Sequence, residues 1–314
     1  MCSPNEKLII IVLNLYGDVK DTYIRQTIEN LQLLMSCSFC STLVISWSNP
    51  PERVKEVFTY FEQLFPRVVL LKLPKMGSGK QRNATLNFVI HNFPNADYIV
   101  YLEEDIKITE MCYINRLINL LDRLPENVVI LSPEPATRLC LDLAGRVITG
   151  RDITIGLTGG FGMFIIRTSA LKHLVKKGLE TYSPYMYFYM EDKEFIFKLW
   201  QECFLTVSVK TAGYTHYGGT VHSQPLYRRY TRYLGPLLAI LINAPLKLVI
   251  LVLIFRSLKT LIQSMIRSEL YLYIRSFIFI LRNIKYVLLY RYYRLTRYRC
   301  RERLKLLFDH CIVI

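Results

Sequence analysis

The chain has 314 residues, of which 52% are hydrophobic and 21% are charged. This apolar content excludes an intrinsically disordered chain, and the length with only 8 cysteines excludes a small disulfide-stapled fold. The formal net charge of +15 is uneven, because residues 1–225 carry 23 Lys and Arg against 22 Asp and Glu, whereas residues 226–314 carry 17 against 3. We therefore predict two parts, a near-neutral globular domain over 1–225 and a basic, apolar tail over 226–314.

Alternating strands and helices are predicted through the first third of the chain. Buried strands are expected over residues 7–13, 42–47, 67–73 and 97–102, and helices over residues 21–35, 50–64 and 79–91. This alternation predicts an α/β fold with a mostly parallel, Rossmann-like sheet that helices cover on both faces. Ligands bind at the carboxyl ends of the strands in such sheets, so the residues that follow each strand are the candidate site residues.

Three consecutive carboxylates, Glu103, Glu104 and Asp105, follow the fourth predicted strand. Their mutual repulsion favours a bound cation. Hard divalent ions such as Mg²⁺ or Mn²⁺ take carboxylate oxygens and leave positions open for substrate phosphates. Glu103 and Asp105 would face the same way in an extended segment and could share one ion. The alternative is a solvated acidic turn.

Three later segments also carry candidate site residues. Gly159 and Gly160 leave the backbone bare for the close approach of a ligand, or form a simple turn. Glu191 and Asp192 open a predicted helix that runs to residue 203, where they either complement the helix dipole or supply a general base. His216 follows a predicted strand over residues 205–209 and is either a metal ligand or a surface histidine.

Four sequence blocks, in this order, resemble the family-2 glycosyltransferases of the GT-A fold, especially the rhamnosyltransferase-like members. The blocks are GSGKQRN at residues 77–83, YLEED at 101–105, the Gly159-Gly160 pair with MFIIR at 163–167, and MEDKE at 190–194. A His-Tyr-Gly-Gly-Thr segment at residues 216–220 closes the series, so that the resemblance covers about residues 7–222.

The resemblance implies an inverting, metal-dependent sugar transfer. Asp105 and Glu103, with His216, would hold Mg²⁺ or Mn²⁺ against the diphosphate of a nucleotide-sugar donor. Asp192, with Glu191 beside it, would be the catalytic base that deprotonates the acceptor hydroxyl.

The same resemblance assigns a second set of residues to the donor. The implied donor-binding residues are Asn14, Arg82, Asn83, Glu103, Glu104, Gly159 and Gly160. The family usually ends its second strand in Asp residues that hold the base and ribose, whereas here the sequence is Ser-Trp-Ser-Asn at residues 46–49. The identity of the nucleotide is therefore left open.

The basic tail contains a long apolar segment at residues 234–255 with a single charge, Lys247. It is long enough to cross a bilayer of ~30 Å hydrocarbon, but both of its flanks are basic, so that a single span would export one of them. An in-plane helix, a re-entrant helix or two spans avoid this conflict. Residues 256–267 follow a basic amphipathic pattern, with Lys259, Thr260 and Ser264 on a polar stripe, and residues 271–293 repeat the theme.

We expect this tail to bind an anionic membrane surface, with a soluble helical subdomain or a dimerisation arm as the alternatives. Polar base-reading residues are scarce, so no nucleic-acid partner is expected. Because no N-terminal signal peptide is visible, the catalytic domain is expected on the cytoplasmic face of the membrane.

The sequence as a whole predicts a hexosyltransferase-type glycosyltransferase of polysaccharide biosynthesis. It would move a sugar from a nucleotide-sugar to a glycan or lipid-linked acceptor hydroxyl at the membrane surface. The alternatives are a sugar-nucleotide nucleotidyltransferase and a non-catalytic membrane-bound protein that binds glycans or acts as a scaffold. The oligomeric state is left open.

Overall fold

The computed structural model describes residues 7–35, 40–65, 67–133, 153–155, 162–182, 191–209, 211–217, 226–243 and 246–297. The chain divides into two compact units. The first consists of Met1–Thr137, Val147–Thr181 and Leu205–Gly218, and the second of Arg138–Arg146, Tyr182–Phe204 and Gly219–Ile314.

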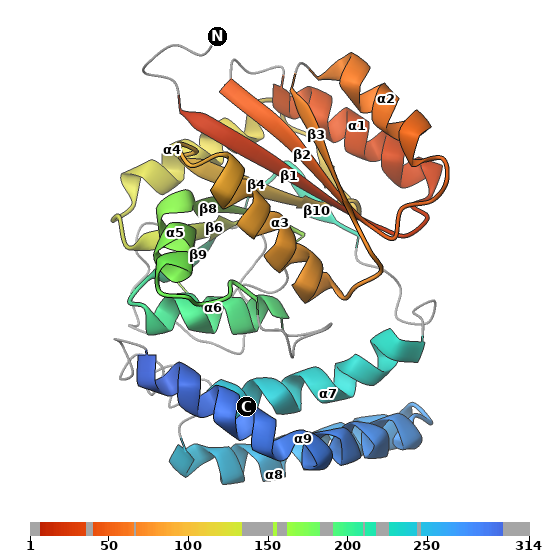
Figure 1. Cartoon of the computed structure of the whole chain (residues 1–314), viewed down its shortest axis with the longest axis vertical. Helices are drawn as coiled ribbons and strands as arrows, with labels where there is room; N and C mark the ends of the chain where they lie inside the picture. Colours follow the sequence, from red (N-terminus) through yellow and green to blue (C-terminus); the bar gives the residue numbers. More distant parts are fainter. Residues whose placement is uncertain are drawn as a thin grey trace. The chain divides into compact units, whose positions relative to one another are not determined.

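The first unit contains an eight-stranded sheet in the order β3-β2-β1-β4-β8-β6-β9-β7 (Figure 1). Its strands are β1 (Leu8–Tyr16), β2 (Cys40–Ser48), β3 (Val68–Leu73), β4 (Tyr98–Glu103), β6 (Val128–Ser132), β7 (Ile153–Ile155), β8 (Met163–Arg167) and β9 (Leu205–Val209). Strands β3, β2, β1 and β4 are parallel neighbours, as are β6 and β9, whereas β8 is antiparallel to β4 and β6, and β7 is antiparallel to β9. The expected α/β fold with a mostly parallel sheet is confirmed.

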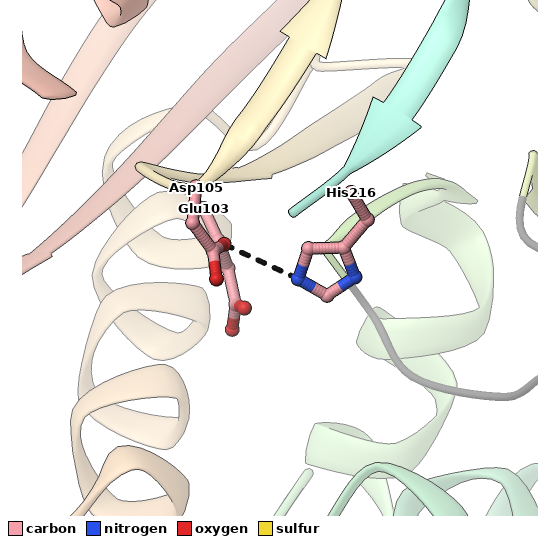
Figure 2. A group of neighbouring side chains, drawn as sticks. All are labelled: Glu103, Asp105 and His216. Atoms are coloured by element: carbon pink, nitrogen blue, oxygen red, sulfur yellow. Dashed lines mark ion pairs between the residues drawn. The ribbon is translucent and has the colours of Figure 1, made fainter. Parts of the chain in front are cut away.

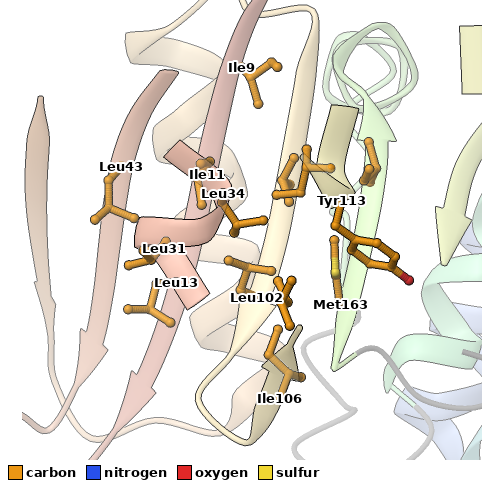
Figure 3. Close-up of a cluster of buried hydrophobic side chains, with 14 of the residues drawn as sticks. Ile9, Ile11, Leu13, Leu31, Leu34, Leu43, Leu102, Ile106, Tyr113 and Met163 are labelled. Atoms are coloured by element: carbon orange, nitrogen blue, oxygen red, sulfur yellow. The ribbon is translucent and has the colours of Figure 1, made fainter. Parts of the chain in front are cut away.

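Helices cover both faces of this sheet, as the apolar strands require. They are α1 (Asp21–Met35), α2 (Val54–Leu64), α3 (Ser78–Asn92), α4 (Tyr113–Arg123) and α5 (Thr168–Lys176). The odd-numbered residues of β1, such as Ile9, Ile11 and Leu13, pack in one buried cluster with Leu31 of α1 and with residues of α2 and α4 (Figure 3). Because side chains alternate along a strand, the even-numbered residues of β1 point to the other face, the face covered by α3.

Among the predicted strands and helices of the sheet, two ends differ from the prediction by three residues or more. Helix α2 begins at Val54 rather than at residue 50, and the Val54 amide donates to the Pro51 carbonyl oxygen at 3.0 Å. Strand β1 continues to Tyr16, because Asn14 is still in register with β2 and β4. The sheet therefore carries polar residues at its carboxyl edge.

The second unit contains the helices α6 (Glu191–Gln201), α7 (Leu226–Asn243), α8 (Leu246–Ile266) and α9 (Leu270–Arg297). A buried cluster joins α7 and α9, with Leu237, Leu238 and Ile242 packed against Ile280 and Val287. The apolar segment 234–255 is shared between two helices, because α7 ends at Asn243 and α8 begins at Leu246. Within the described residues, no helix combines the length and the apolar character that a membrane crossing needs.

Candidate functional site

A row of polar side chains lies at the carboxyl edge of the sheet, on the face covered by α3. Asn14 of β1 is in register with Ser46 of β2 on one side and with Glu103 of β4 on the other. In-register residues of neighbouring parallel strands point to the same face. Ser46 fixes which face this is, since its hydroxyl accepts a hydrogen bond from Thr85 of α3 at 2.6 Å. The row therefore places Glu103 and Asn14 where ligands bind in such sheets.

A short antiparallel ribbon brings His216 to the same edge. Strand β10 (Tyr214–His216) pairs with β5 (Ile106–Ile108), which follows β4 after a two-residue turn, and His216 is opposite Ile106. The Tyr217 amide also donates to the Asp105 carbonyl oxygen at 2.9 Å. As a result the Nε2 atom of His216 lies 3.2 Å from Oδ1 of Asp105 (Figure 2).

Glu103, Asp105 and His216 form a compact group that fits a divalent metal ion. One ligand atom from each residue lies within 4.8 Å of the others, and all three side chains are partly buried. Two carboxylate oxygens and an imidazole nitrogen are a donor set that Mn²⁺ or Mg²⁺ accepts, with coordination positions left for substrate oxygens. The structure thus brings together the three residues that the sequence predicted as metal ligands.

Arg82 of α3 places a positive charge beside this group. Its guanidinium forms an ion pair with Glu103, and its Nε donates to the Tyr101 hydroxyl at 2.9 Å. The Arg82 side chain is 5% exposed and that of Glu103 is 26% exposed. Burial raises the pKa of the Glu103 carboxyl, Asp105 adds to this effect, and Arg82 and His216 oppose it. Arg82 therefore offsets the cost of keeping a second carboxylate next to Asp105.

Asn14 is buried without a hydrogen-bonding partner among the described residues. Its side chain is 7% exposed, and neither its Oδ1 nor its Nδ2 atom has a partner there. A buried amide that forms no hydrogen bond is costly, and such groups are uncommon in folded proteins. Its position beside Glu103 makes it a candidate for binding a polar ligand at this edge.

Several residues that sequence reasoning did not single out hold this edge in place. The Gln81 side-chain amide donates to the carbonyl oxygens of Leu15 and Ser46, at 3.0 and 2.9 Å, and so ties α3 to β1 and β2. Trp47 is buried, and its Nε1 donates to the Gly17 carbonyl oxygen at 2.8 Å. Their buried polar contacts reach across the sheet, and no local sequence signal marks them.

The other residues that the sequence predicted for the site have the following positions. The Asn83 side chain accepts hydrogen bonds from the Thr181 amide, at 3.1 Å, and from its hydroxyl, at 2.6 Å, and so anchors the segment after α5. Glu104 lies in the turn between β4 and β5. Glu191 and Asp192 are the first two residues of α6, in the second unit, and Glu191 is buried there. Gly159 and Gly160 lie outside the described residues.

Comparison with known proteins shows which solved structures have a similar fold. No family model and no curated protein matches this sequence. Among solved structures, the mannosyltransferase PcManGT from Pyrobaculum calidifontis, in complex with GDP-Man and Mn²⁺, aligns over 98% of this chain and 86% of its own, with a TM-score of 0.55 and 9% identity.

S. aureus TarS aligns over 80% of this chain with a TM-score of 0.50 and 14% identity, and this chain spans only 41% of that TarS chain. TarS 1–349 aligns over 86% of this chain and 71% of its own, with a TM-score of 0.50 and 13% identity. At these identities the similarity is one of fold alone.

Proposed function

We propose that the chain is a metal-dependent, inverting glycosyltransferase that uses a nucleotide-sugar donor and a glycan or lipid-linked acceptor. The observation that carries the proposal is the convergence of Glu103, Asp105 and His216 at the carboxyl edge of the sheet. The fold supports it, since the PcManGT structure holds GDP-Man and Mn²⁺. The four sequence blocks that resemble family-2 glycosyltransferases are a third support.

Asp105 and His216 would be the principal metal ligands, with Glu103 completing the group. A divalent cation held there would neutralise charge on the diphosphate as it leaves the sugar. Arg82 keeps the Glu103 carboxylate in place through their ion pair, and Asn14, whose amide has no partner among the described residues, offers it to a polar group of the donor. The site therefore binds the donor through charge and orients it through buried polar groups.

Asp192 would act as the base. In this step its carboxylate takes the proton of the acceptor hydroxyl while the acceptor oxygen bonds to the anomeric carbon, and the bond from that carbon to the diphosphate oxygen breaks. Attack from the face opposite the leaving group inverts the anomeric configuration. A positioned carboxylate of this kind typically contributes about 10²–10⁴-fold to the rate.

The test is transfer by the full chain with Mn²⁺ and a panel of uridine, guanosine and thymidine diphosphate sugars. Release of the nucleoside diphosphate is measured, and the anomeric configuration of the product is read by NMR. Asp192→Asn should lower transfer by about 10²-fold or more with unchanged donor affinity. The matched control is Glu126→Gln, an exposed carboxylate that should leave the rate unchanged. Full activity of Asp192→Asn, or a product of retained configuration, would refute the mechanism.

The same assay, run also with a sugar phosphate and nucleoside triphosphates, separates the two alternative functions. A nucleotidyltransferase would consume a sugar phosphate and a nucleoside triphosphate and release pyrophosphate. A non-catalytic glycan-binding or scaffold protein would bind the donor or the glycan and release no nucleoside diphosphate with Mn²⁺. Either pattern would replace the proposed transferase.

A further inference from the structure

The two C-terminal helices leave a large apolar face exposed. Helix α8 exposes Leu258, Ile262 and Met265, and α9 exposes Ile274, Leu281 and Leu288, each between 45% and 60% of its surface. Intervals of three, four and seven residues put each set on one side of its helix. We call this set the apolar face. Large apolar side chains that gather on exposed sides of neighbouring helices mark an interaction site.

The interior of this helical pair contains small polar residues beside the buried apolar residues Leu272, Ile280 and Val287. Thr260 and Ser264 of α8 and Ser276 of α9 are buried, the two serines completely. The hydroxyls of the two serines are satisfied locally, since Ser264 donates to the Leu261 carbonyl oxygen at 2.7 Å and Ser276 to that of Leu272 at 2.8 Å. Small polar residues between helices and large apolar residues outside reverse the pattern of helices in water. That arrangement is typical of helices whose outer side contacts lipid.

The charge of the helical pair has one sign on its exposed surface. Glu269 is the only acidic residue in 246–297, and it is 5% exposed and paired with Arg229, whose Nε lies 2.6 Å from its carboxylate. Among the described side chains of the two helices, the exposed cations are Lys259 on α8 and Arg275, Arg282 and Lys285 on α9. Cations spaced along α9 suit a helix that lies in the headgroup plane rather than one that crosses the bilayer.

We propose that the apolar face of α8 and α9 binds an anionic lipid surface. The apolar side chains enter the acyl boundary of one leaflet, and the surrounding Lys and Arg contact lipid phosphates. The charge decides between this occupant and a second copy of the chain. An isologous dimer through this face would bring cation against cation with no exposed carboxylate of the pair to compensate. The inference is independent of sugar transfer, because lipid binding needs no donor, acceptor or metal.

Vesicle co-sedimentation of the full chain tests the proposal without any substrate. The vesicles are phosphatidylcholine alone and phosphatidylcholine mixed with phosphatidylglycerol. Binding to the mixed vesicles should exceed binding to the neutral ones at least about tenfold and should fall with added salt.

Two variants separate the charge from the apolar contribution. Arg282→Glu with Lys285→Glu should lower binding to mixed vesicles at least about tenfold. The matched control is Arg25→Glu with Lys55→Glu, which makes the same change of net charge at exposed sites of α1 and α2 and should bind nearly as the parent does. Leu281→Gln with Leu288→Gln should weaken binding to both kinds of vesicle with an unchanged melting temperature, since both leucines are exposed.

Three outcomes would overturn the proposal. Equal loss in the reversal variant and its control would show attraction by net charge alone. A chain that ignores both vesicles but elutes as a dimer would assign the face to a second copy. A lower melting temperature of the Leu281→Gln, Leu288→Gln variant without vesicle binding would show that another part of this chain covers the face.

Discussion

The ion pair between Arg82 and Glu103 offers a sharp test of how the site is held together. Arg82→Met removes the guanidinium and keeps much of the side-chain volume. It leaves the partly buried Glu103 carboxylate next to Asp105 without the Arg82 cation. It also removes the hydrogen bond that Arg82 Nε donates to the Tyr101 hydroxyl. The variant should therefore unfold more easily in metal-free buffer.

The size of this effect follows from the exposure of the two partners. Removing one member of a fully buried pair costs about 3–5 kcal/mol. Glu103 is 26% exposed, so that water recovers part of this cost, and we expect a loss of about 2–3 kcal/mol for Arg82→Met. Adding Glu103→Gln removes the stranded carboxylate. The double variant should regain stability, with a coupling free energy of about 1–2 kcal/mol.

The assay is a double-mutant cycle by urea unfolding. The fluorescence of Trp47, which is buried in the sheet of the first unit, reports the transition, and Trp200→Phe in all proteins removes the signal of the second unit. A control cycle uses Arg116→Met and Glu110→Gln, an ion pair of 2.9 Å whose side chains are 50% and 37% exposed. Such an exposed pair should couple by less than about 0.5 kcal/mol.

A coupling free energy in the Arg82 cycle that is no larger than that of the control cycle would refute the reasoning, because the stability losses of the two single variants would then be additive. They would mean that Arg82 does not offset the charge of Glu103, and that the carboxylate is stabilised in another way.

Three further predictions concern single residues. Asp105→Asn should weaken Mn²⁺ binding, measured by calorimetric titration, by more than the ~10-fold that is typical when a residue supporting a metal ligand is lost. Glu126→Gln should not change the Mn²⁺ affinity. Asn14→Leu should stabilise the ligand-free protein by about 1 kcal/mol in urea and weaken donor binding, and unchanged donor affinity would place Asn14 outside the donor site. Burial raises the pKa of Asp122, but hydrogen bonds from Lys7 and Tyr98 outweigh it and leave that pKa below its usual range. Asp122→Asn should therefore cost about 1–2 kcal/mol at pH 7. A cost that does not shrink as the pH is lowered below the ordinary Asp value of 3.8 would contradict the assignment, since this stability is lost as the pH falls through the lowered pKa.

Local patterns along the chain were enough to predict most of the sheet and its covering helices. The helix over residues 21–35 and the strand over 205–209 have the predicted bounds, because the hydrophobic periodicity and the length of each apolar segment decide them. The acidic turn after the fourth strand was also visible, since parallel strands end at the same edge of a sheet. These features depend on residues that are near one another in sequence.

The contacts within the site depend on tertiary structure. Asp105 and His216 meet only because β5 and β10 pair across more than a hundred residues. Arg82 reaches Glu103 from α3, which packs against β2 and against β1, the neighbour of β4, and on the same helix Asn83 bonds to Thr181 instead. Spacing in the sequence carries no information about which of two adjacent helix residues points to the sheet edge.

The basic tail shows the same division. The sequence alone determined that +14 of the net charge lies after residue 225 and that residues 256–267 have a polar and an apolar stripe. Only the tertiary structure decided that Thr260 and Ser264 lie inside while Leu258 and Ile262 lie outside. Periodicity creates two faces on a helix, but the face that becomes buried is chosen by the elements that pack against it, and these come from distant parts of the chain.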